Sequence, residues 1–255
     1  MSTLAAAAHC VIFSDLARVK AGEQVEIGGE QAHHAVRVKR LRPGEAVGLI
    51  DGAGAVAHGV LSGVGGSKNR PTLRVQVRAV ERVEPLAPRL EILAPAPKGD
   101  RLDRMIDQLT QLGVAAYRPL MCEHAQRKPE TIRVDKLDRI GHEAMKQCRR
   151  AWAMEIGEPI GFTDALSDPD AVVADASGAS LSPGEVRERV ALLIGPEGGW
   201  SPGERRAIED AGVPKRWFGP FVLRIEAAAC AATAIVMAAS NRDSQRPLST
   251  PEGSQ

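Results

Sequence analysis

Residues 189–204 of this 255-residue chain read RVALLIGPEGGWSPGE, and they carry its strongest structural signal. The apolar run at 190–194 has the length of a buried strand, and it ends in a loop of glycine, proline and glutamate. Ser201, Pro202 and Glu204 then form a Ser-x-x-Glu box with proline at the first helical position, which is typical of a helix start. Backbone amides therefore gather where a strand is followed by a helix, which is where open α/β sheets bind ligands.

This loop lacks the two common phosphate-binding motifs. No Lys-Ser or Lys-Thr follows its last glycine, and it contains no Gly-x-Gly-x-x-Gly pattern. Glu197, in the middle of the loop, would also repel a polyphosphate. The pattern favours a ligand that needs close backbone approach and accepts a nearby carboxylate, such as an adenosine that carries a cationic group. A simple tight turn is the alternative interpretation.

The composition excludes several classes of protein. A net charge of +1 means that nucleic-acid binding would need local basic patches. The four cysteines are scattered and the histidines show no ligand spacing, so neither a disulfide framework nor a metal site is indicated. Residues 1–13 lack the positive segment of a secretory signal, and the alanine-rich stretch at 227–239 is too short to cross a bilayer. We therefore expect a cytoplasmic protein without a membrane segment.

The chain divides into a β-rich first part and an alternating second part. Short strand-like runs with turn residues between them predict a small β-barrel over residues 1–84, with strands at 24–27, 46–50, 55–61 and 72–80 and one helix at 31–38. Residues 85–242 predict an α/β domain with a parallel sheet, with strands at 90–94, 115–121, 171–174, 190–194 and 216–218 and helices at 101–112, 134–150 and 226–240. A second Ser-Pro-Gly-Glu at 182 predicts a further helix start. Residues 243–255 have the composition of a disordered tail.

A second strand-exit loop, residues 219–226, reads GPFVLRIE and again leads directly into a helix. If both loops open on one edge of the sheet, they face a common ligand. Arg224 would then bind an anionic nucleotide, and Glu226 would order the site. The alternative is that Glu226 caps the helix and forms a salt bridge.

Basic residues gather at several places and indicate RNA phosphate contacts, with a solvated helix face as the alternative. Trp152, beside one of these groups, would either stack on a base or cover the helix end. The candidate RNA-binding residues are His34, Arg37, Arg40, Arg42, Arg127, Lys128, Arg149 and Arg150.

Four segments, at 33–45, 98–113, 192–204 and 219–228, resemble the RsmE family of small-subunit ribosomal RNA uridine-N3 methyltransferases. The pairing of LIGPEGG with VLR-x-E some twenty residues later is highly specific to that family. The resemblance implies a PUA-like RNA-binding barrel, a SPOUT domain with a trefoil knot, a homodimer, and S-adenosylmethionine as methyl donor. Its implied substrate is ribosomal RNA or the small ribosomal subunit, at N3 of uridine 1498 in the common numbering.

The resemblance also assigns site residues. Arg224 would stabilise charge on the uracil oxygens or position the phosphate, and Glu226 would be the base or its orienting partner. The residues implied to bind the cofactor are Ile194, Gly195, Glu197, Gly198, Gly199, Phe218, Gly219, Val222 and Leu223.

Three single positions depart from the family pattern: Phe221 replaces Arg, Ile225 replaces Thr, and Lys146 replaces Glu. The stretch at 123–128 likewise replaces a more typical Glu-Arg-Ser start. They affect the choice of target nucleotide more than the cofactor. Two alternatives therefore remain open. One is a SPOUT methyltransferase that modifies another RNA position, and the other is a non-catalytic protein that binds RNA or assists ribosome assembly.

Overall fold

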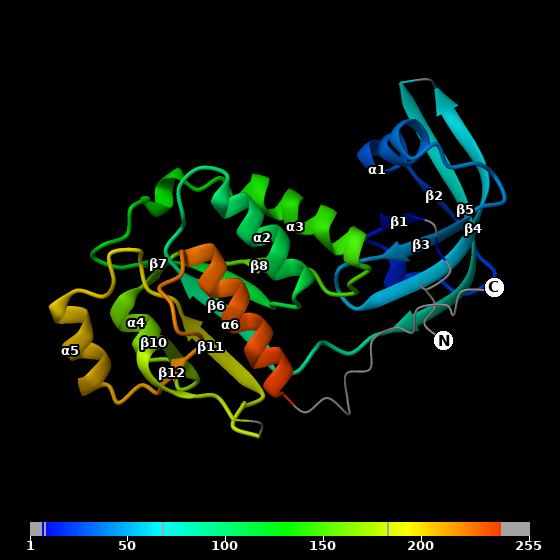
Figure 1. The fold of residues 1–255 in the computed structure, drawn as a ribbon. Helices are drawn as coiled ribbons and strands as arrows, with labels where there is room; N and C mark the ends of the chain where they lie inside the picture. The colour runs from blue at the N-terminus through cyan, green and yellow to red at the C-terminus, as the bar shows by residue number, and fades with distance from the viewer. Residues whose placement is uncertain (1–6, 8, 68, 183, 241–255) are drawn as a thin grey trace. The chain divides into compact units, whose positions relative to one another are not determined.

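The computed structural model describes residues 7, 9–67, 69–182 and 184–240, and the contacts between them form two compact units. The first unit contains the described residues up to Pro85 together with Met145–Ala153, and the second contains Leu86–Ala144 and the described residues from Met154 to Ser240. Figure 1 shows the helices and strands of each unit. The tail predicted at 243–255 lies outside the described residues.

A five-stranded sheet forms the first unit. Its order is β1 (His9–Ile12), β3 (Ala46–Ile50), β4 (Ala55–Ser67), β5 (Arg70–Arg82) and β2 (Gln24–Ile27). β1 and β3 pair in parallel, and the other neighbours are antiparallel. Alternate side chains of β5 point into the core: Leu73 and Val75 are fully buried, whereas Arg74 between them is exposed. This alternation gives the sheet one apolar face.

β4 and β5 are longer than predicted, because glycines in β4 have the composition of a loop. The structure shows why the strand tolerates them. A Cβ at Gly59 would lie 2.6 Å from the Val75 side chain, and Gly66 has a φ of 75°. The register between the two strands also shifts beside Gly59. Glycine therefore permits the close approach and irregular pairing of this hairpin.

The helix predicted at 31–38 is confirmed, but it starts earlier and changes type. It consists of α1 (Gly29–His33) and a wider π-helical turn, η2 (His34–Val38). Ala32 and Ala35 are fully buried against the sheet, which fixes this segment on the apolar core. A single 3-10 turn, η1 (Leu16–Arg18), precedes β2.

Residues 145–153 belong to the first unit through specific contacts, which the sequence pattern did not indicate. The Trp152 indole Nε1 donates to the Val83 carbonyl at 2.8 Å, and a Cβ at Gly54 would lie 2.5 Å from the Trp152 ring. Arg149 donates to the Ala7 carbonyl at 2.8 Å. Of the two interpretations of Trp152, the structure supports packing.

A parallel sheet forms the second unit, as predicted. Its order is β12 (Lys215–Trp217), β10 (Ala171–Ser180), β11 (Arg189–Leu193), β6 (Arg89–Ala94), β7 (Ala116–Met121) and β8 (Glu155–Ile156), and β9 (Ile160–Gly161) also pairs with β7. Residues on both sides of β11 are buried, as expected for a parallel strand covered on two faces.

Helices cover both faces of this sheet. α2 (Arg101–Gln111) and α6 (Ile225–Ala239) pack with Leu90 and Leu192 on one face. α4 (Phe162–Leu166) and α5 (Pro202–Asp210) pack with Ala191 and Leu193 on the other. α3 (Val134–Cys148) follows the short η3 (Pro129–Thr131).

The local helix rules were right at α5 and wrong at Ser182. Ser201 and Glu204 form the predicted capping box, with Pro202 in the first turn. At Ser182 the same four residue types begin no helix: the Glu185 amide donates to the Ser182 carbonyl, and a turn results. α4, β8 and β9 were not predicted because each is too short to show periodicity. None of the described helices is long and apolar enough to span a bilayer.

Candidate functional site

Two loops leave the carboxyl edge of the parallel sheet and lead into helices. One follows β11 and ends at α5, and the other follows β12 and ends at α6. β10 lies between β11 and β12, so the two loops leave next-but-one strands at the same edge of the sheet. This is the arrangement that the two glycine-containing segments predicted, and it is where open sheets bind ligands.

The first loop is held tightly by its neighbours. Ile194 is buried and donates its amide to the Leu93 carbonyl at 2.9 Å. Gly199 has a φ of 71°, a conformation that favours glycine. A Cβ at Gly195 would lie 3.1 Å from Trp200, which packs against Phe162 in the core. The loop is therefore preorganised, and Trp200 has a packing role.

The segment after β7 closes on this loop. His124 Nδ1 lies 2.8 Å from the Gly199 carbonyl oxygen, and a Cβ at Gly198 would touch the His124 ring. The Glu204 carboxylate, besides capping α5, accepts the amide of Glu123 at 2.8 Å. The segment after β7 therefore also contacts the loop after β11, which the sequence did not indicate.

The second loop carries exposed apolar side chains. Phe221 is 80% exposed, Val222 is 96% exposed, and Leu223 is 40% exposed. Phe218 and Gly219, which precede them, are half-buried. Three consecutive exposed apolar residues indicate a surface that another molecule covers.

A half-buried ionic cluster joins the two loops through a residue that sequence reasoning missed. Arg101 Nη1 lies 2.6 Å from Glu197 Oε1 and 3.9 Å from Glu226 Oε2. Glu226 Oε2 is buried and makes no hydrogen bond to the described residues. The hydrogen bond to Glu197 raises the pKa of Arg101 above its ordinary value. Both carboxylates lie beside the same guanidinium, and one oxygen of Glu226 has no hydrogen-bond donor among the described residues.

Arg224 and Glu226 have different environments. Arg224 is the exposed N-cap residue of α6, and its carbonyl accepts the Ala228 amide at 2.8 Å. Its side chain makes no hydrogen bond or ion pair to the part of the chain that the structure describes. Glu226 makes no capping bond, and its ion-pair partner is Arg101. Of the alternative interpretation of Glu226, the salt bridge is present, with Arg101 as the partner, whereas the capping bond is absent.

Four candidate RNA-binding residues lie close together in the first unit. His34 and Arg37 belong to η2, Arg40 follows it with a φ of 55°, and Arg42 is exposed next to the turn before β3. The His34 ring stacks on His9 with centroids 5.9 Å apart. The three arginines are all exposed, so this segment presents a basic surface.

The other candidates are more constrained. The Arg149 guanidinium donates a hydrogen bond to the Ala7 carbonyl. Burial lowers the pKa of Arg150 to about 10. In the second unit, Arg127 donates to the Thr131 carbonyl at 2.9 Å, and Lys128 is exposed. Arg149 and Arg150 thus have structural contacts that their sequence did not indicate.

The three positions that depart from the family pattern lie in different surroundings. Phe221 is exposed, whereas Ile225 is buried at the first turn of α6. Only 7% of Lys146 is exposed, and its Nζ lies 3.4 Å from Gln31 Oε1. At this position of α3 the side chain is buried in the first unit.

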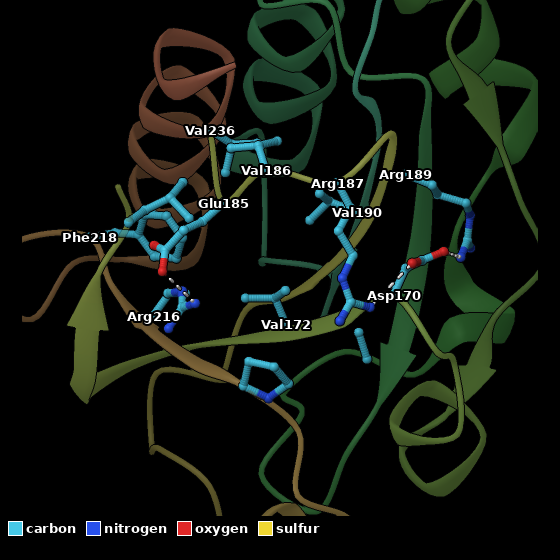
Figure 2. Close-up of a pocket in the computed structure, with 13 residues that line it drawn as sticks. Asp170, Val172, Glu185, Val186, Arg187, Arg189, Val190, Arg216, Phe218 and Val236 are labelled. Carbon is cyan, nitrogen blue, oxygen red and sulfur yellow. Dashed lines mark hydrogen bonds and ion pairs between the residues drawn. The ribbon is translucent and has the colours of Figure 1, made fainter. Parts of the chain in front are cut away.

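A separate cavity of about 270 Å³ lies in the second unit, beneath α6. Figure 2 shows its apolar lining, which includes Val172, Val190 and Val236, and its charged rim. Each rim arginine that the figure labels is paired with a carboxylate, as in the contact of 3.6 Å between Arg216 and Glu185. Phe218 is the one predicted cofactor residue in its lining, so the cavity is not the loop site.

Over the described residues, no group of histidine, cysteine or acidic side chains is arranged to hold a metal ion.

Two family models match the chain. One, described as an RNA methyltransferase domain, matches residues 84–237, and the other, described as an RNA methyltransferase PUA domain, matches residues 27–75. Among curated proteins, ribosomal RNA small subunit methyltransferase E of Mycobacterium bovis is 29% identical over 236 residues, which cover 87% of this chain and 88% of that protein. The protein of the same name from Bacillus subtilis is 28% identical over 222 residues, covering 79% and 85%.

Solved structures have the same fold. A Legionella pneumophila protein, described as a methyltransferase in complex with the cofactor SAM, is 26% identical, has a TM-score of 0.74, and is matched over 97% of its length and 91% of this chain. Ribosomal RNA small subunit methyltransferase E from Neisseria gonorrhoeae is 23% identical with a TM-score of 0.74, covering 89% of this chain and 95% of that one, and it supports the fold alone.

Proposed function

The chain belongs to the RsmE family of RNA methyltransferases, and we propose that it methylates N3 of a uridine in small-subunit ribosomal RNA, uridine 1498 in the common numbering. It is an S-adenosylmethionine-dependent methyltransferase. The observation that carries the proposal is the convergence of Glu197 and Glu226 from the two strand-exit loops. A site with two carboxylates and one guanidinium suits a cationic cofactor and disfavours a polyphosphate.

The loop residues fit that cofactor. Glycines at 195, 198 and 199 let Trp200, His124 and Arg205 pack closely on the loop and so fix its shape. Glu226 Oε2 lacks a hydrogen-bond donor that a bound group would supply. When bound, S-adenosylmethionine supplies an electrophilic methyl group. The backbone of 194–199 and 218–223 would hold its adenosine, in agreement with the residues assigned from the family resemblance.

The residues at the start of α6 would accept the proton of uracil N3 and stabilise the negative charge that its loss leaves. Uracil N3 is protonated at neutral pH and must lose its proton before it attacks a methyl group. Glu226 would accept that proton or orient the group that does. Arg224, which is exposed and carries a full positive charge, would stabilise the negative charge on the uracil oxygens or position the adjoining phosphate.

The first unit would bind the RNA. The exposed arginines at 37, 40 and 42, together with His34, form the basic surface, and Arg127 and Lys128 would add contacts from the second unit. In this scheme, residues 1–84 recognise RNA and residues 85–242 perform the transfer. Because ribosomal RNA is the substrate, the protein would act in the cytoplasm.

A homodimer and a trefoil knot complete the proposal. α6 exposes a stripe of small apolar residues, Ala227, Ala234, Ile235 and Ala238, near the exposed loop residues Phe221 and Val222. A second copy that covers this stripe would remove that apolar surface from water. The knot would bring the segment after β12 through the loop that follows β11.

Mapping of modified uridines tests the proposed target. Small-subunit RNA from cells with and without this gene would be digested and analysed for 3-methyluridine. We expect the modification at one uridine to disappear when the gene is deleted and to return with the intact gene. A lost modification at another position would favour the alternative RNA target, and no change in methylation would favour the non-catalytic role.

A further inference from the structure

Arg101 occupies a position that helix formation does not favour. It is the first residue of α2, where the helix dipole attracts carboxylates and repels cations. Asp100, the N-cap residue, makes no capping bond and instead pairs with Arg104 at 2.5 Å. Only 25% of the Arg101 side chain is exposed. A cation held at this helix end therefore requires compensating contacts.

Those contacts join three segments that are distant in sequence. The Arg101 guanidinium donates to Glu197 Oε1 at 2.6 Å and to the Lys98 carbonyl at 3.3 Å, and it lies 3.9 Å from Glu226 Oε2. The two glutamate side chains are 22% and 18% exposed, so water screens them weakly. One guanidinium thus holds the loop after β11 and the start of α6.

Removing the guanidinium would leave two carboxylates at one poorly solvated site. Like charges at such a site repel, and the Glu197 loop would move away from α6. Glu226 would also lose its ion-pair partner. The other hydrogen bonds of the loop among the described residues, such as that of the Ile194 amide with the Leu93 carbonyl, go to segments other than α6.

We propose that Arg101 is a positioning residue for methyl transfer. It acts through Glu197 to hold residues 195–199 at a fixed separation from α6, and it orients the Glu226 carboxylate. This inference rests on the proposed function in one respect, namely that these two loops hold the cofactor. Arg101 itself need not touch either substrate.

Calorimetric titration with S-adenosylmethionine tests the coupling between Arg101 and Glu197. We expect Arg101→Gln and Glu197→Gln each to raise the Kd about tenfold, which is the scale of a charge-assisted hydrogen bond. The double variant should also show about a tenfold loss, because both changes remove one interaction. Arg104→Gln is the matched control: Arg104 lies on the same helix with a 71% exposed side chain, and its Kd should stay within twofold of wild type. A double variant whose loss of affinity equals the product of the two single losses would overturn the proposal. So would an Arg101→Gln variant whose Kd equals that of the Arg104→Gln control.

Hydrogen exchange of the ligand-free protein gives a second readout. In Arg101→Gln, we expect faster exchange of the backbone amides of Gly195, Glu197, Gly198 and Gly199 and unchanged exchange in β6, since the fold itself does not depend on the pair. If Arg101→Gln fails to fold, Arg101→Lys replaces it, and a Lys that reaches only one carboxylate should give an intermediate Kd. Exchange that is unchanged at 195–199 would contradict the inference. A wild-type protein that binds the cofactor without forming 3-methyluridine would instead contradict the proposed function alone.

Discussion

The guanidinium of Arg101 lies 2.6 Å from the Glu197 carboxylate, although the two residues are 96 positions apart in the chain. This contact assigns Glu197 a structural partner and explains how an acidic side chain is accommodated in the glycine loop. It also places a positive charge between the loop and Glu226. The cluster of Arg101, Glu197 and Glu226 therefore holds one cation against two anions, which agrees with a cationic cofactor.

Arg224 is expected to act in the transfer and not in cofactor binding. Arg224→Ala should lower kcat by about 100-fold or more, the usual effect of removing one group that stabilises developing charge. The calorimetric Kd for S-adenosylmethionine should stay within threefold, because the side chain points to no partner in the described structure. Arg206→Ala, an exposed arginine of α5, is the control. Normal turnover of the Arg224 variant would remove it from the mechanism.

Dimer formation should depend on the exposed stripe of α6. Ala234→Glu places a charge in the middle of the stripe, and burying an unpaired carboxylate is strongly unfavourable. Light scattering coupled to size-exclusion chromatography should show a dimer for wild type and a monomer for this variant. Ala211→Glu, at an exposed position after α5, should remain dimeric. A monomeric wild-type protein would show that this face has another partner.

Phosphate contacts in the first unit should appear as a change in salt dependence. The double variant Arg37→Gln, Arg42→Gln removes two positive charges, so its log Kd for ribosomal RNA should depend less steeply on log salt concentration, by about 1.5 units of slope. Arg18→Gln with Lys20→Gln removes two charges elsewhere in the same unit, and we expect the wild-type slope. Equal slopes for all three proteins would place the RNA surface elsewhere.

The pair formed by Asp168 and Arg189 should make stability depend on pH. Both Asp168 oxygens accept from Arg189 at 2.7 Å, and this bonding holds the pKa of Asp168 below its ordinary value. A carboxyl with a lowered folded pKa stabilises the protein above its unfolded pKa, and this stabilisation is lost as pH falls through the folded pKa. Asp168→Asn should therefore lower the free energy of unfolding by about 1 to 3 kcal/mol at pH 7, with a smaller difference below about pH 4.

Urea unfolding at pH 7 and pH 3 checks this difference. Asp210→Asn, at the exposed end of α5, is the control and should match wild type at both values. A loss of stability in Asp168→Asn that is the same at both pH values would mean that packing, and not ionisation, accounts for the effect.

Local patterns predicted the elements that carry the site but not the contacts between them. Ser201 and Glu204 are three residues apart, so the start of α5 follows from sequence alone. The glycines of β4 misled the strand assignment, because their role depends on β5 across the hairpin. Arg101 was missed for a similar reason: a charged residue in the first turn of an amphipathic helix has no distinguishing sequence pattern, and its partners come from two other strand-exit loops.

The burial of Lys146 is a second feature that the local sequence pattern does not predict. A lysine near a helix end is usually solvated, yet this one lies in the core of the first unit beside Gln31. Residues Val134–Ala144 of this helix belong to the second unit and Met145–Cys148 belong to the first. Periodicity locates a helix but does not specify which unit each turn contacts.

Mass spectrometry of nucleosides tests the central claim most directly. Purified protein would be incubated with S-adenosylmethionine carrying a labelled methyl group and with small ribosomal subunits from cells that lack this gene. We predict labelled 3-methyluridine at a single position, and none with the Arg224→Ala variant. Label in another nucleoside, or no label with a wild-type protein that binds the cofactor, would contradict the account.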